Sequence, residues 1–138
     1  MHIKRLQDIS RSLFSIILLS GGIANAIIVL TDPDLYSGFA DLSLLPLYQQ
    51  LWVNLIMPNL RFMIGLVVIL EWFIAVLLLG KRFAVKLGSV IGGVFMVLLI
   101  PFWWSGAGIL NLAFALILFW LATSEYPSSV LALLNVGE

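Results

Sequence analysis

Glu71 is the residue of this sequence whose type and position could most readily do chemistry. It lies in a continuous apolar stretch, ten residues after Arg61 and ten before Lys81. A helix rising about 1.5 Å per residue places it about 15 Å from either charge, near the midplane of a hydrocarbon core about 30 Å thick. An ionised carboxylate is costly there, so the group should be protonated, paired or in contact with a wet cavity. Two hypotheses stay open: an acid that couples protons or contacts a ligand, and a neutral acid hydrogen-bonded between helices.

Four further side chains could contact the same ligand or a lipid. Asn25 and Asn111 are expected in the outer halves of the first and last apolar segments, where Arg61 could join them in a polar cluster. Hydrogen bonds between helices and an Arg61 that reaches the headgroups are the simpler roles. Trp72 could line a cavity or pack against lipid, and its indole N–H needs a partner. The candidate ligand- or lipid-contacting residues are Glu71, Trp72, Asn25, Arg61 and Asn111.

The residue types that most enzyme and cofactor sites require are missing. The chain has no cysteine and its only histidine is His2, which excludes thiolate metal sites, iron–sulfur ligation and a haem held by two histidines. Asp32 and Asp34 could bind a divalent metal in an enzyme acting on lipid headgroups, but such a pair flanking a proline is more often a turn. No nucleotide-binding loop or nucleophile–base pair is present. We expect no catalytic residue, no metal and no cofactor held by this chain alone.

The composition predicts that these residues lie in a membrane. Of the 138 residues, 62% are hydrophobic and 10% are charged, whereas a soluble domain carries about 25% charged residues to cover its surface. We expect an all-α integral membrane protein: one domain of four transmembrane helices in a bundle. The expected spans are about 12–30, 60–80, 84–102 and 108–124. The formal net charge of zero gives no field that would recruit nucleic acid.

The segment between the first two spans is a long outer loop. Apolar residues recur at helical spacing between Pro46 and Pro58, over a stretch too short to span. This pattern predicts an amphipathic interfacial helix that lies on the membrane or packs over the bundle. Tyr36 and Trp52 of this loop, and Trp103 beyond the third span, are typical of an aromatic belt at headgroup level.

Two glycines four residues apart bear on how the third span packs. Gly88 and Gly92 form a G-x-x-x-G pattern, which allows close helix approach either inside the bundle or against another protein.

The charged residues predict the orientation. Three acidic residues and one basic residue, Asp32, Asp34, Asp41 and Arg61, lie on the side of the long loop. The other basic residues lie on the opposite side: Lys4, Arg5, Arg11, Lys81, Arg82 and Lys86. Since cytoplasmic loops carry the excess of Lys and Arg, both termini should be cytoplasmic. We expect a prokaryotic plasma membrane.

Two stretches resemble the DoxX-like family of small four-helix membrane proteins. They are LFSIILLSGGIANAI in the first span and PNLRFMIGLVVILEWFIAVLLLGKRFAVKLGSVIGG across the second and third. Glu71 and Gly80 match the family pattern, as does Gly21 or Gly22. The family includes a small subunit of an archaeal thiosulfate–quinone oxidoreductase, so the resemblance implies an accessory role in a larger assembly.

Two functional hypotheses follow. The first is a non-catalytic accessory or anchor subunit of a larger membrane complex, redox or quinone-linked, whose partners are membrane lipid and other membrane subunits. The alternative is a small proton-coupled transporter that acts as a homodimer with Glu71 as its coupling acid.

Overall fold

The computed structural model describes residues 2–134, and every regular element in that range is helical. Long α-helices alternate with short helical turns, several of them 3-10 or π in geometry. In chain order the elements are α1 (His2–Thr31), η1 (Pro33–Leu42), α2 (Pro46–Leu51), η2 (Trp52–Ile56), η3 (Met57–Asn59), α3 (Leu60–Leu79), α4 (Phe83–Leu99), η4 (Ile100–Phe102), α5 (Gly106–Ala122) and α6 (Val130–Leu134).

Three helical stretches are long and apolar enough to cross a membrane: Ile3–Thr31, Pro46–Leu79 and Phe83–Phe102. A fourth apolar helix, α5, has 17 residues. Large apolar side chains remain exposed along all four, as in a bundle whose outer surface faces lipid. These features confirm an all-helical fold and indicate an integral membrane protein. The first helix begins well before its apolar run, at His2.

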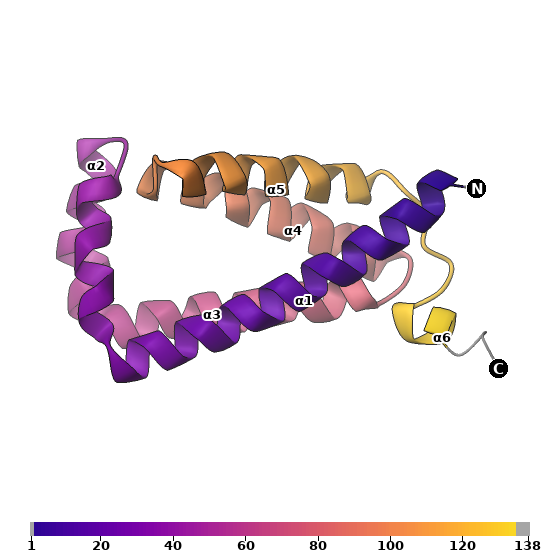
Figure 1. The fold of residues 1–138 in the computed structure, drawn as a ribbon, viewed down its shortest axis with the longest axis horizontal. Helices are drawn as coiled ribbons and strands as arrows, with labels where there is room; N and C mark the ends of the chain where they lie inside the picture. The colour runs from indigo at the N-terminus through magenta and orange to yellow at the C-terminus, as the bar shows by residue number, and fades with distance from the viewer. Residues whose placement is uncertain (1, 135–138) are drawn as a thin grey trace.

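The long helices form two packed pairs (Figure 1). α1 lies along α3, and α4 lies along α5. The short turn after α3 makes α3 and α4 a hairpin that joins the pairs. The pairs diverge toward the other end, where the segment from η1 to η3 runs across the opening. This segment therefore packs over the end of the bundle, which is one of the two placements expected for the amphipathic stretch.

Prolines and one serine set the helix boundaries around the opening. Pro33 and Pro46 occupy the first turns of η1 and α2, where a missing N–H costs nothing. Ser105 caps α5 by accepting a hydrogen bond from the N–H of Ala107. The backbone N–H of Leu44 donates to Pro101, and that of Trp104 donates to Leu42, so the loop is tied to the α4–α5 connection.

Glycines on α4 bring that helix close to both neighbours. A Cβ at Gly88 would lie 2.7 Å from Leu77 Cβ and 3.3 Å from the Ile74 carbonyl oxygen of α3. At Gly92 it would meet Ile74 and Leu118, so this position packs between α3 and α5. The close approach that the G-x-x-x-G pattern predicted is therefore used inside the bundle.

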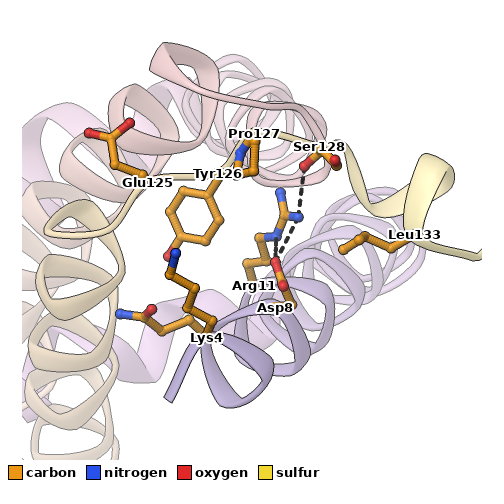
Figure 2. Close-up of a pocket in the computed structure, with 9 residues that line it drawn as sticks. Lys4, Asp8, Arg11, Glu125, Tyr126, Pro127, Ser128 and Leu133 are labelled. Atoms are coloured by element: carbon orange, nitrogen blue, oxygen red, sulfur yellow. Dashed lines mark hydrogen bonds and ion pairs between the residues drawn. The ribbon is translucent and has the colours of Figure 1, made fainter. Parts of the chain in front are cut away.

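The hairpin end of the molecule is held by Arg11, which sequence reasoning used only to assign orientation. Its side chain is 1% exposed and donates to the carbonyl oxygens of Gly80 at 2.8 Å and Ser128 at 3.0 Å. Asp8 pairs with it at 2.8 Å, and the Tyr126 ring lies 4.8 Å from the guanidinium carbon (Figure 2). A cation at the final carbonyl groups of α3 suits that helix end. Arg11 thereby joins α1, the α3 terminus and the segment after α5.

Gly88→Ala should destabilise the protein, because the new methyl group would press on the α3 backbone. Overpacking of this kind lowers the free energy of unfolding by about 1–3 kcal/mol, measurable as a lower thermal midpoint in detergent. Gly65→Ala on α3 is the matched control, since a Cβ there meets nothing within 4 Å. It should leave the midpoint unchanged or raised, and equal losses for both variants would contradict the packing argument.

Candidate functional site

A cavity of about 500 Å³ lies where the helix pairs diverge. Its wall is formed by one face of α1, the inner faces of α3 and α4, the start of α5, and side chains from η1 and η2. Most of the lining is apolar, including Ile64, Val67, Met96 and Phe114. The volume falls within the range of about 300–1,000 Å³ that is typical of small-molecule sites.

The packing of α1 against α5 determines where the cavity begins. The Phe14 and Phe114 rings meet edge to face with centroids 5.1 Å apart. Beyond this contact α1 and α5 share few neighbours. Ile17 and Ala24 on α1 line the cavity and are also exposed at the outer surface. The cavity therefore approaches the lipid-facing surface along α1.

A chain of three hydrogen-bonded side chains forms the polar part of the wall. The Tyr36 hydroxyl donates to Asn25 Oδ1 at 3.0 Å, and Asn25 Nδ2 donates to Glu71 Oε2 at 3.2 Å. Gly21 makes room for the carboxyl group, since a Cβ there would lie 3.4 Å from Glu71 Oε1. Glu71 is 9% exposed. Asn25 of α1 therefore binds the carboxyl group directly, and Tyr36 of the loop binds Asn25 in turn.

The loop positions Tyr36 through a second aromatic residue. Trp52 Nε1 donates to the Tyr36 carbonyl oxygen at 2.9 Å, and both side chains are buried. Burial, and secondarily the charge of Glu71, raise the pKa of the Tyr36 hydroxyl. Tyr36 therefore keeps its proton at neutral pH and acts as the donor at the loop end of the chain.

Two other groups of the wall have no partner among the described residues. Asn111 Nδ2 and Trp103 Nε1 are buried N–H donors without a hydrogen bond. Leaving a buried donor unsatisfied costs about 1–3 kcal/mol. Both residues line the cavity, although the two N–H atoms themselves have almost no accessible surface in this structure.

The structure brings together three of the five candidate residues, Glu71, Asn25 and Asn111. Trp72 lies outside: its ring is 42% exposed, crosses Gly22 of α1, and donates to the Leu19 carbonyl oxygen at 3.3 Å. Arg61 is exposed beside a separate groove that it shares with Asp34.

Three aromatic residues that were predicted at headgroup level also line the cavity. They are Tyr36, Trp52 and Trp103, and the first two are buried. The only signal for an interior position was their polar atoms, which need partners wherever they are buried. Around Asp32 and Asp34, the described residues form no cluster of acidic or histidine side chains that could hold a metal ion.

The arrangement can bind an apolar molecule, and the Glu71 carboxyl group can hold a proton. The apolar wall excludes water from a ligand's hydrocarbon part, and Asn111 and Trp103 of the wall each carry a buried N–H without a partner among the described residues. The carboxyl, amide and phenol of the three-residue chain lie in one hydrogen-bonded line.

No protein-family model matches the chain, and neither a curated protein nor a solved structure shows significant similarity to it. The resemblance to the DoxX-like family stays a prediction.

Tyr36→Phe should lower stability, because it removes one hydroxyl and leaves Asn25 Oδ1 without its donor. The expected loss is about 1 kcal/mol, seen as a lower thermal midpoint in detergent. Tyr48→Phe is the matched control, since its hydroxyl makes no hydrogen bond in the described part of the chain while its ring packs on Phe102. Indistinguishable midpoints for the two variants would refute a stabilising role for the Tyr36 hydrogen bond.

Proposed function

We propose that this protein is a non-catalytic subunit of a larger, quinone-linked membrane complex, and that its cavity binds the lipid-soluble quinone. The observation that carries the proposal is the cavity of about 500 Å³, which combines an apolar lining with buried, unpartnered N–H donors. A quinone has matching chemistry: two carbonyl acceptors on a flat ring and an apolar tail.

The donor set of the cavity favours an acceptor over a donor in the bound molecule. Asn111 Nδ2 and Trp103 Nε1 both need an oxygen or nitrogen lone pair. Glu71 already receives a hydrogen bond from Asn25. A quinone carbonyl would satisfy these donors once the two side chains rotate toward the cavity, whereas a pure hydrocarbon would leave them unpaired.

The proposed topology has four spans, with both termini in the cytoplasm of a prokaryotic cell. At about 1.5 Å per residue the 17 residues of α5 extend for about 25 Å, slightly less than the hydrocarbon core of about 30 Å. Local thinning of the bilayer accommodates such a helix at modest cost. The excess of Lys and Arg at the hairpin end supports the orientation.

The resemblance to the DoxX-like family supports the subunit role, because that family includes a small subunit of a thiosulfate–quinone oxidoreductase. Broad exposed apolar faces on all four long helices leave room for contacts with other membrane subunits as well as with lipid.

A proton-coupled homodimeric transporter remains the second candidate. The buried Glu71 carboxyl group at the cavity wall favours it, since Asn25 holds this group by a hydrogen bond next to a space that a substrate could fill. Glu71 would then bind and release the coupling proton.

Asn111→Leu should weaken quinone binding by about tenfold, the effect of losing one good hydrogen bond. Binding of a short-chain ubiquinone analogue to the purified protein is measured by quenching of tryptophan fluorescence, because Trp52 and Trp103 line the cavity. Asn59→Leu is the control, since this exposed asparagine bonds only to the Leu55 carbonyl oxygen in the described structure. Non-saturable quenching, or the same affinity in both variants, would contradict a quinone site at this cavity.

The subunit role is tested by gentle extraction from the native membrane followed by native mass spectrometry. The expected result is recovery with larger partner proteins in fixed stoichiometry. Recovery alone or as a homodimer would count against it. The transporter would then be tested in vesicles, where Glu71→Gln should abolish uptake driven by a pH gradient.

A further inference from the structure

The hairpin end of the molecule carries a second hollow that the proposed quinone site does not use. It is a groove of about 390 Å³ between the first turn of α1, the α3–α4 turn and the segment after α5. Its six lining residues are Lys4, Arg82, Phe83, Lys86, Glu125 and Pro127. Three are basic and one is acidic: Lys4 comes from α1, and Arg82 and Lys86 come from the start of α4. The groove therefore has the charge that an anion would need.

Backbone contacts fix the elements that carry these cations. The N–H of Arg82 donates to the Tyr126 carbonyl oxygen at 2.6 Å, which joins the α3–α4 turn to the segment after α5. Arg82 has a positive φ of 50°, a conformation that persists in a non-glycine residue only where surrounding contacts hold it. Arg11 donates to the carbonyl oxygens of Gly80 and Ser128; Figure 2 shows the contact with Ser128. The backbone segment that carries Arg82 is therefore fixed in position by these contacts.

The groove also has an apolar side. Phe83 is the first residue of α4 and is 73% exposed. Because α4 is one of the helices that can cross a membrane, its first turn lies at the level where headgroups meet acyl chains. Cations next to an exposed aromatic ring at that depth match the two parts of a phospholipid.

We propose that this groove binds the phosphate of an anionic phospholipid through Lys4 and Arg82, with an acyl chain against Phe83. Basic pockets between transmembrane helices are a known means of holding anionic lipid headgroups. The site would bind lipid whether or not the cavity binds quinone.

Glu125 limits the affinity of this site. It pairs with Lys86 at 2.7 Å, and that hydrogen bond lowers the pKa of the Glu125 carboxyl group. Glu125 is therefore ionised at neutral pH and competes with a phosphate for Lys86. Removing its charge should release a third cation to the lipid.

The first test compares two double variants that lose the same charge at the same end of the bundle. Lys4→Gln/Arg82→Gln removes groove cations, whereas Arg5→Gln/Lys81→Gln removes cations that do not line it. Binding of phosphatidylglycerol to the detergent-solubilised protein is measured by native mass spectrometry, with phosphatidylcholine as the neutral reference. The groove variant should lose more than about tenfold in affinity and the control variant far less. Equal losses of affinity in the two double variants would indicate a diffuse electrostatic attraction and would overturn the proposal. An unchanged affinity in the groove variant would overturn it as well.

The second test has the opposite sign. Glu125→Gln should tighten phosphatidylglycerol binding several-fold, whereas a merely structural Lys86–Glu125 pair predicts a lower thermal midpoint and no gain in lipid affinity. Unchanged or weaker lipid binding would overturn the proposal.

Inorganic phosphate at millimolar concentration should fail to displace the lipid, because it lacks the chain that contacts Phe83. Full displacement would reject the lipid in favour of a simple phosphate site.

Discussion

The structure depends on one constraint: a carboxyl group in the middle of an apolar bundle must find its partners within the protein. Glu71 finds them on α1, where Gly21 leaves space for the carboxyl group and Asn25, one turn further along, donates to it. Tyr36 then completes the bonding of Asn25, which brings the loop down onto the same site. The need to satisfy one buried carboxyl group thus helps to position α1, α3 and the loop relative to one another.

Unequal packing creates the cavity beside this group. Gly88 lets α4 approach the α3 backbone closely, and Gly92 and Gly93 make room for the Leu118 and Phe119 side chains of α5, so that side of the bundle is tightly filled. α1 and α5 share few contacts, one of which is the edge-to-face contact of the Phe14 and Phe114 rings. The helix pairs therefore separate beyond those rings, and loop aromatics close the end. The positions of the small residues thus determine which helices pack closely and where the cavity forms.

The sequence predicted the helical class and the approximate positions of the long apolar helices, because composition and continuous apolar runs are strong local signals. It did not reveal which faces point inward. α3 and α5 are apolar nearly all round, so periodicity cannot tell that Trp72, next to Glu71, faces outward. Tyr36, Trp52 and Trp103 suit a lipid interface and a cavity wall equally well, since each has an apolar body and a polar tip. Arg11 meets Gly80 and Ser128 through contacts distant in sequence, which no local pattern encodes.

The unpartnered donors of the cavity couple occupancy to stability. Asn111 and Trp103 each carry a buried N–H without an acceptor in the described structure, and a bound carbonyl would remove that penalty. A ligand that binds only the folded state stabilises it by about 2.7 kcal/mol at a hundred times its dissociation constant. Under the proposed function the folded bundle would be most stable when quinone is abundant, although the protein itself catalyses no reaction. Such coupling needs no catalytic residue, which accords with a site built from amide, indole, phenol and one carboxyl group.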